Sequence, residues 1–229
     1  MQTYQASCIF DGKATLAEGP GWDEERQAIV WVDIEKGKIS RFYPSTHRNE
    51  TWAISQKVGC VVRTSKGDLL AGGQEGLLKL NPESGEVTSL QNPEPDLPVN
   101  RFNDGKCDPQ GRLWAGTMSC EEEEGAGSLY RITNEGSVKR MVESVTISNG
   151  LAWSQDGTSM YYIDTPTRHV DAFDFDPVEG EISKRRHVIE IPKDMGYPDG
   201  MTIDAEGKLW VALWAGWGVG RWDPATGEL

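Results

Sequence analysis

A short strand pattern recurs five times along this chain of 229 residues, and its period restricts the fold more than any other feature. The copies align on five large side chains spaced 39, 44, 48 and 48 residues apart: Trp31, Leu70, Trp114, Tyr162 and Trp210. All but the first copy follow a Gly-containing turn, as in 111–116 and 207–212. A period of this length matches a unit of four short strands.

A second strand pattern follows each copy and ends at a turn. These strands are expected at 37–44, 76–82, 127–133, 169–177 and 218–224. Alternating side chains, β-branched and aromatic content, and turn residues at the ends are typical of antiparallel strands, and no segment shows a long helical period. We therefore predict an all-β fold made of β-propeller blades, because a four-stranded blade needs neighbours to cover its faces.

Five blades can be recognised in what we predict to be one domain, residues 1–229. Residues 4–10 are expected to form a strand with no blade of its own, and the chain ends at 226–229, just after a turn pattern. Both features suggest that one more blade once closed the ring, so we expect a C-terminally shortened propeller. An open ring would expose sheet edges and apolar blade faces.

The composition excludes several classes of partner. A net charge of −13 repels nucleic acid phosphates and anionic membrane surfaces, and the chain has no apolar stretch long enough to span a bilayer. The N-terminus lacks the pattern of a signal peptide, so we expect a cytoplasmic protein. Its cysteines form no CxxC pair and lie near no His cluster, which favours free thiols: Cys8, Cys60, Cys107 and Cys120.

A short polar residue followed by glycine marks one point in each of four blades. The pairs are Glu18-Gly19, Asp104-Gly105, Asn149-Gly150 and Asp199-Gly200. Three of the polar residues, Glu18, Asn149 and Asp199, stand five residues before a matching turn residue, respectively Asp23, Ser154 and Asp204. They therefore occupy one register of the repeat.

The third blade offers two candidates for the same register. Counting five residues back from its turn residue, Asp108, gives Asn103, whereas matching the glycine gives Asp104. One of these neighbours is expected to point inward and the other outward, and the count favours Asn103. The second blade has Val58-Gly59 here, so the ring of ligands has a gap that could admit a substrate.

Two interpretations of the polar-Gly pairs remain open on these grounds. Asn-Gly and Asp-Gly pairs are common in hairpin turns for conformational reasons alone. Four polar residues in one register, one from each of these blades, would instead converge at the channel mouth of a propeller and gather oxygen ligands, as a hard divalent cation requires. With no His in the set, Ca²⁺, Mg²⁺ or Mn²⁺ suits it better than Zn²⁺.

The motifs together resemble the regucalcin/gluconolactonase family, also called senescence marker protein, over essentially the whole chain. The resemblance rests on Glu18-Gly19-Pro20, 100–106 (Asn-Arg-Phe-Asn-Asp-Gly-Lys), Gly116-Thr117-Met118, 148–153 (Ser-Asn-Gly-Leu-Ala-Trp), 161–164 (Tyr-Tyr-Ile-Asp) and 198–204 (Pro-Asp-Gly-Met-Thr-Ile-Asp). It implies a six-bladed β-propeller with one divalent cation in the channel, and hydrolysis of sugar lactones such as gluconolactone. The family chain normally continues for a further blade, which this chain lacks.

The resemblance also assigns site residues. It implies Glu18, Asn149 and Asp199 as metal ligands, with calcium preferred and zinc, magnesium or manganese as alternatives. Arg101 and Asn103 match positions that hold substrate oxygens. Glu121 matches a substrate-contacting carboxylate, although the run 121–124 also has the composition of a solvated loop.

The expected mechanism is hydrolytic: the cation polarises the lactone carbonyl and acidifies a water, and Asp199 accepts its proton. The chain has no G-x-S-x-G elbow and no phosphate-binding G-x-x-x-x-G-K-[ST] loop, which disfavours a serine hydrolase or a nucleotide enzyme. A phosphotriesterase at the same metal and a non-catalytic, calcium-binding propeller are the alternatives. The histidines His47, His169 and His187 lie far apart in sequence and are expected to be structural.

Overall fold

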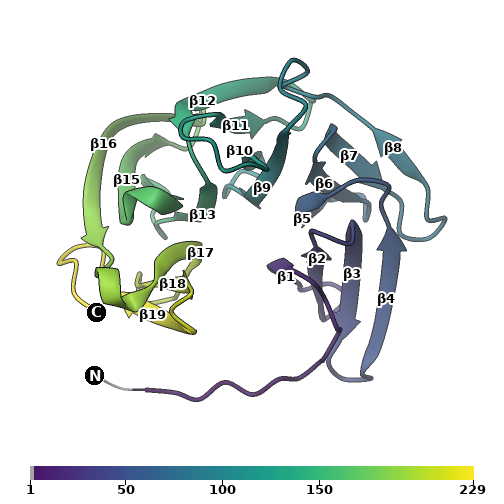
Figure 1. Ribbon diagram of the computed structural model, residues 1–229, viewed down its shortest axis with the longest axis horizontal. Helices are drawn as coiled ribbons and strands as arrows, with labels where there is room; N and C mark the ends of the chain where they lie inside the picture. Colours follow the sequence, from purple (N-terminus) through teal and green to yellow (C-terminus); the bar gives the residue numbers. More distant parts are fainter. Residues whose placement is uncertain (1–2) are drawn as a thin grey trace. The chain divides into compact units, whose positions relative to one another are not determined.

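A computed structural model describes residues 3–229, which fold into five antiparallel sheets in chain order (Figure 1). In every sheet each strand pairs with the next one along the chain. The chain divides into two compact units, residues 1–102 and 103–229, with the boundary inside strand β9. This arrangement confirms the all-β class and the count of five blades; the single domain stays a prediction.

Unit 1 contains two four-stranded sheets. The first is formed by β1 (Ala17–Asp23), β2 (Ala28–Asp33), β3 (Lys38–Tyr43) and β4 (Arg48–Ala53), and the second by β5 (Val58–Arg63), β6 (Leu69–Gly73), β7 (Gly76–Leu80) and β8 (Val87–Ser89). Branched side chains from both sheets share one core, which includes Val30, Ile39, Val61 and Leu78. In this core each of the two sheets covers an apolar face of the other, as expected for neighbouring blades.

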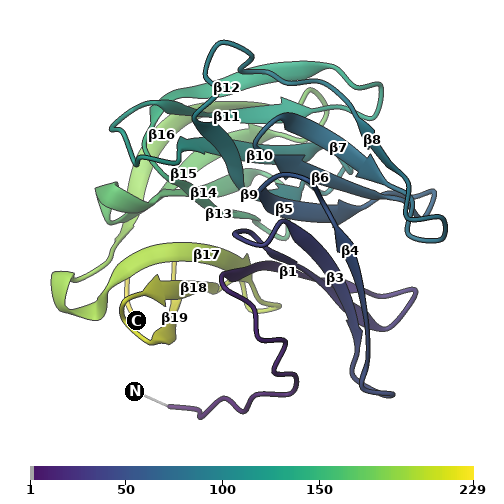
Figure 2. The ribbon, with the colours of Figure 1, turned by 45° about the vertical axis from the view of Figure 1, so that its right-hand side comes forward.

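Unit 2 holds the other three sheets. They are formed by β9 (Asn100–Cys107), β10 (Leu113–Ser119), β11 (Gly127–Ile132) and β12 (Val138–Val145); by β13 (Ser148–Trp153), β14 (Ser159–Asp164), β15 (His169–Asp176) and β16 (Glu181–Glu190); and by β17 (Tyr197–Ile203), β18 (Leu209–Trp214) and β19 (Gly218–Trp222). Two short 3-10 helices, η1 (Thr165–Thr167) and η2 (Lys193–Met195), lie in connections. Figure 2 shows β17, β18 and β19 side by side.

Aromatic side chains close the cores of unit 2. Trp114 from β10 packs edge-on against Trp153 from β13, with ring centroids 6.1 Å apart, and both rings contact Phe175. Trp222 from β19 is buried with Val211, Ile163 and Ile189 in a second core. Each of these cores joins neighbouring sheets of the repeat.

The turn residues of the repeat organise the first hairpin of a blade. Asp108 accepts hydrogen bonds from the backbone N–H of Arg112 (3.0 Å) and from the indole N–H of Trp114 (3.0 Å). Asp204 repeats the pattern with the backbone N–H of Lys208 (3.0 Å) and the indole of Trp210 (2.8 Å). The aspartate and the tryptophan six residues later therefore form one hydrogen-bonded motif that recurs in two blades.

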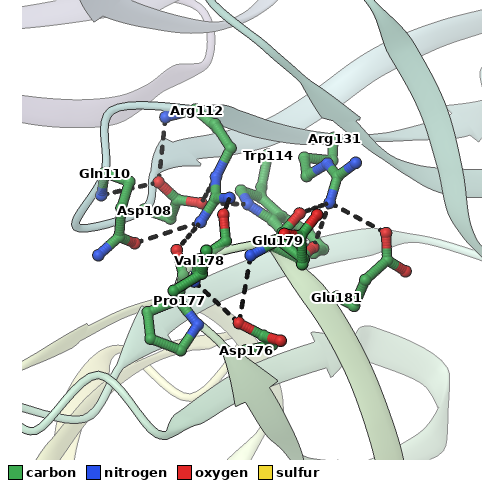
Figure 3. A network of polar contacts seen from close by, with 11 residues as sticks. Asp108, Gln110, Arg112, Trp114, Arg131, Asp176, Pro177, Val178, Glu179 and Glu181 are labelled. Carbon is green, nitrogen blue, oxygen red and sulfur yellow. Dashed lines mark hydrogen bonds and ion pairs between the residues drawn. The ribbon is translucent and has the colours of Figure 1, made fainter.

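Arginine side chains tie one blade to the next in unit 2 (Figure 3). The Arg112 guanidinium pairs with the buried Asp108 carboxylate at 2.6 Å and donates to the carbonyls of Pro177 (2.8 Å) and Val178 (3.0 Å). Arg131 donates to carbonyl oxygens in the same turn, between β15 and β16. The sheets that carry β9 and β13 are thus held together away from their inner strands.

Three smaller predictions can be compared with the structure. The strand expected at 4–10 is wrong: the segment is irregular, and Phe10 stacks face-on upon Phe42 (4.5 Å) instead of joining a sheet edge. All four cysteines are free, as expected. Within residues 3–229 no helix is long and apolar enough to cross a membrane.

Candidate metal centre

The polar-Gly pairs lie inside the first strand of their sheets rather than in hairpin turns. Glu18-Gly19 is in β1, Asn149-Gly150 in β13 and Asp199-Gly200 in β17. At each of these places the pairing with the next strand shifts register, between residues 18 and 21, 148 and 151, and 198 and 201. Such bulges re-aim side chains next to functional sites. The hairpin-turn interpretation of these three pairs is therefore wrong.

Asn103 and Asn149 meet in unit 2. The side-chain amide of Asn103, on β9, donates to the backbone carbonyl of Ser148 (2.8 Å) and lies 3.3 Å from Oδ1 of Asn149. Both asparagines are about 4% exposed. The register count that selected Asn103 in the third blade thus identified a residue that reaches the candidate ligand of the fourth.

Asn149 is linked to the strand that carries Asp199. Its amide Nδ2 donates to the hydroxyl of Thr165 (2.8 Å), and this hydroxyl donates to the carbonyl of Pro198 (2.8 Å). Thr165 is 7% exposed, so the link is buried. One threonine therefore connects the candidate ligand of β13 to the backbone of β17 directly before Asp199.

The backbones of β13 and β17 also approach closely at the glycine of the Asn149-Gly150 pair. A Cβ atom at Gly150 would lie 2.5 Å from Cβ of Met201 and 2.8 Å from the carbonyl oxygen of Asp199. Side-chain carbons do not tolerate such distances. Glycine is required here because two inner strands pack together, and not because its backbone is left-handed.

Asp199 carries a half-buried carboxyl group whose pKa is raised to about 6. Burial is the main cause, and the carboxylate of Asp104 is the second. The pKa of Asp104 is itself raised by burial, against the opposing effect of Lys106. Both neighbours in the third blade therefore act on the site: Asn103 through a hydrogen bond, and Asp104 through its charge.

Lys106 is the single basic side chain in this group. Its ammonium donates to the backbone carbonyl of Met201 at 2.7 Å and thereby joins β9 to β17. Burial lowers the pKa of Lys106, and the charge of Asp104 opposes that shift. Among the residues that the structure describes, no cation forms an ion pair with Asp199. The site therefore holds two carboxylates and one ammonium.

The other predicted site residues are placed individually. Glu18, in β1, is half-buried, and Arg101, at the start of β9, is 8% exposed and donates to the carbonyl of Phe102 (3.0 Å). Both belong to unit 1. Glu121 is an exposed residue of the loop after β10, where its backbone N–H donates to the hydroxyl of Ser119. Their roles stay predictions.

Two residues of the site were missed from the sequence. Thr165 lies in a connection and Lys106 lies three residues beyond the register position, so neither belongs to the repeating polar-Gly signal. The chemistry available is oxygen ligation: an amide oxygen from Asn149 and a carboxylate from Asp199. Within 3–229, no three His, Cys, Asp or Glu side chains gather as a metal-binding group, so a cation site here depends on asparagine as a donor.

Comparisons with known proteins identify relatives of this chain. Regucalcin of Xenopus laevis is 42% identical over 234 residues, which cover 100% of this chain and 78% of the relative. A Bacillus subtilis (strain 168) protein, YvrE, whose name refers to a sugar lactone lactonase activity, is 39% identical over 93% of this chain and 73% of its own length.

A solved structure described as the calcium-binding protein regucalcin from Agrobacterium tumefaciens matches with a TM-score of 0.89. It is 30% identical, over 94% of this chain and 73% of that one. Residues 16–229 match the model of the SMP-30/gluconolactonase/LRE-like region, which includes every candidate residue considered above. This chain therefore belongs to the SMP-30/gluconolactonase/LRE-like family.

Proposed function

We propose that this protein is a metal-dependent hydrolase of sugar lactones, with a divalent cation bound by Glu18, Asn149 and Asp199. Membership of the family and the name of the Bacillus subtilis relative support the substrate class. The observation that carries the proposal is the buried hydrogen-bonded link from the Asn149 amide on β13, through Thr165, to the backbone of Pro198, the residue before Asp199 on β17. A six-bladed ring in the cytoplasm is the frame that we propose for this site.

The donors suit a hard cation. Asn149 offers an amide oxygen and Asp199 a carboxylate, and all-oxygen ligand sets are those preferred by Ca²⁺ and Mg²⁺. The local charge also favours a cation. The two negative charges of Asp104 and Asp199 exceed the single positive charge of Lys106, and a bound cation would offset this excess. Calcium is the preferred ion, with magnesium, manganese or zinc as alternatives.

In this proposal the side chains divide the work of lactone hydrolysis. When bound, the cation would supply Lewis-acid polarisation of the lactone carbonyl and acidify a water. Asp199 accepts the proton of the attacking water while the water oxygen forms a bond to the acyl carbon. The acyl–oxygen bond of the ring then breaks, and the proton passes to the released alkoxide, giving a hydroxy acid.

Substrate positioning falls to the residues that flank the ligands. Arg101 presents a planar set of N–H donors suited to orienting hydroxyl groups and offsetting charge. The Asn103 amide is held rigidly by Ser148, so it can orient a substrate oxygen at little entropic cost. Glu121 contributes from its exposed loop once a substrate lies over the site.

A second candidate function is calcium binding without turnover. The description of the Agrobacterium structure as a calcium-binding protein favours it, because ligation alone needs only the ligand set. Fold similarity alone cannot decide between the two. An enzyme requires the flanking Arg101 and Asn103, whereas a calcium buffer does not.

The test is hydrolysis of glucono-δ-lactone followed by acid release at constant pH, corrected for the spontaneous reaction. We expect activity that disappears with chelator and returns with Ca²⁺ or another divalent cation. Asp199→Asn should lower the rate by about 10²–10⁴-fold, as expected when a general base is removed. Asp194→Asn, an exposed carboxylate in η2, is the matched control and should keep full activity.

The outcomes separate the candidates. Full turnover by metal-loaded Asp199→Asn would show that Asp199 is not the base. Calcium binding without hydrolysis of any sugar lactone would favour the non-catalytic function. Hydrolysis that is unaffected by chelation would contradict the metal site itself.

A further inference from the structure

Thr165 occupies a buried position between two candidate ligand strands. It begins η1, directly after β14, and its backbone N–H donates to the carbonyl of Ile147 at 3.1 Å. The preceding residue, Asp164, accepts the backbone N–H of Ile147 at 2.9 Å. The backbone of Thr165 is thus anchored to the segment that leads into β13, so its hydroxyl has a defined position.

The direction of each hydrogen bond at Thr165 follows from the chemistry of its partners. The carbonyl of Pro198 can only accept, so the single hydroxyl proton of Thr165 must be donated to it. The hydroxyl oxygen is then left to accept. The atom of Asn149 that lies 2.8 Å away must therefore be the Nδ2 donor and not the oxygen.

An independent constraint acts at the other end of the amide. The carbonyl of Ser148 can also only accept, so the Asn103 atom 2.8 Å from it must be the Nδ2 donor. The same NH₂ group faces Oδ1 of Asn149 at 3.3 Å. Two backbone carbonyls, those of Ser148 and Pro198, thus require the same orientation of Asn149.

We propose that Thr165 is a positioning residue that fixes the orientation of the Asn149 side-chain amide. In this orientation Oδ1 faces Asn103 and the cation, and Nδ2 points away from both, toward Thr165. The same hydroxyl holds the backbone at Pro198, one residue before Asp199. The orientation of the amide stands on its hydrogen bonds alone. Its consequence for cation affinity rests on the proposed function.

Removing the hydroxyl alone should release this constraint. Thr165→Val keeps the branched shape but leaves Nδ2 of Asn149 and the carbonyl of Pro198 buried without this partner. Groups deprived of a buried hydrogen bond rotate to recover one, and a rotated amide would present N–H to a cation. Loss of an outer-shell partner typically lowers metal affinity about 10–100-fold. Thr165→Ser keeps the hydroxyl and should retain most of the affinity.

Nuclear magnetic resonance of the chelated full chain tests the orientation without a metal. With asparagine labelled by ¹⁵N, the NH₂ signals of Asn149 are those lost in Asn149→Asp. In the wild type we expect an Overhauser contact between these protons and the Thr165 methyl group. The signals should move in Thr165→Val and stay in place in Thr165→Ser. The control is Thr167→Val, in the same helix η1, whose hydroxyl donates to the Asp164 carbonyl (2.7 Å).

Calorimetric titration with Ca²⁺ alone gives the second readout. We expect Thr165→Val to bind about 10–100-fold more weakly, while Thr165→Ser and Thr167→Val stay within a few-fold of the wild type. Circular dichroism and thermal melting check that the variants fold.

Each outcome bears on the proposal. No contact between the Asn149 amide and the Thr165 methyl in the wild type would overturn it, even if Thr165→Val does not fold. Unchanged Asn149 signals in a folded Thr165→Val would overturn it as well. If the wild type binds neither Ca²⁺ nor Mg²⁺, Mn²⁺ or Zn²⁺, the proposed function fails, whereas the amide signals still decide the role of Thr165. Equal Ca²⁺ affinity of the valine and serine variants would refute its effect on the cation.

Discussion

Replacing Gly150 with alanine tests the close approach of β13 and β17 on which the candidate site depends. The added Cβ would lie 2.5 Å from Cβ of Met201, and 2.8 Å from both the amide nitrogen of Met201 and the carbonyl oxygen of Asp199. All three distances lie well inside ordinary contact, and two of the atoms are backbone. Strand β17 must therefore move by roughly half an ångström or more, at a cost of about 1–3 kcal/mol.

Gly200→Ala provides a matched control in the other strand of this contact. The nearest atom to its added Cβ is Oδ2 of Asp104 at 4.0 Å, and Gly200 has no positive φ. Both substitutions lower the conformational entropy of the unfolded chain by a similar amount, which favours folding by about 0.4–1 kcal/mol. The difference in stability between the two variants therefore isolates the clash.

Urea unfolding and thermal melting measure that difference. We expect Gly150→Ala to be about 1–3 kcal/mol less stable than Gly200→Ala, which corresponds to roughly 2–12 °C in melting temperature for a chain of this size. Calorimetry should also show weaker Ca²⁺ binding by Gly150→Ala, because the carbonyl that clashes belongs to Asp199. Equal stability of the two variants, or a larger loss in Gly200→Ala, would refute the packing argument.

Three further predictions concern charges in unit 2. Arg112→Leu leaves the buried Asp108 carboxylate without its cation and should lower the free energy of unfolding by about 3–5 kcal/mol, measured in urea. Asp104→Asn removes a like charge and should lower the pKa of Asp199 from about 6 in chelated protein, measured by carboxyl ¹³C titration. Since the folded-state pKa of Asp199 exceeds its ordinary value of 3.8, its ionisation costs stability as pH rises between these values, and this loss should shrink in Asp104→Asn. Burial first, and Asp108 second, raises the pKa of the Cys107 thiol to about 11, so iodoacetamide should modify it roughly 100-fold more slowly than an unperturbed thiol at pH 8.

Each of these predictions has a contrary result. Wild-type stability of Arg112→Leu would mean that the contacts in Figure 3 do not hold the blades together. An unchanged pKa of Asp199 in Asp104→Asn would show that the two carboxylates are not electrostatically coupled. Alkylation of the half-buried Cys107 as fast as that of the exposed Cys120 would contradict the raised pKa of its thiol.

The blade repeat could be predicted from the sequence because each copy carries its own local signals. Asp108 and Asp204 each precede a tryptophan by six residues, and the structure shows that the aspartate accepts the indole N–H. Counting five residues back from the turn residues Ser154 and Asp204 placed Asn149 and Asp199 in one register, at the bulges where the structure has them. The period of the repeat therefore predicted both the fold and the main candidate ligands, Asn149 and Asp199.

What could not be predicted depends on contacts between strands far apart in sequence. Lys106 reaches a carbonyl 95 residues away, and no pattern near it indicates that partner. Strand alternation predicted that one of Asn103 and Asp104 would point away from the site, yet both act on it. The strand expected at 4–10 has suitable residues, but a strand also needs an edge to pair with.

Crystallography with calcium can locate the cation that we propose for this protein. Crystals of the protein soaked in Ca²⁺ should show one ion bound by Oδ1 of Asn149 and by the carboxylates of Asp199 and Glu18, at about 2.3–2.6 Å. The amide nitrogen of Asn149 should still face Thr165. An ion bound elsewhere, such as at the acidic loop 121–124, with none beside Asn149 and Asp199, would contradict the account.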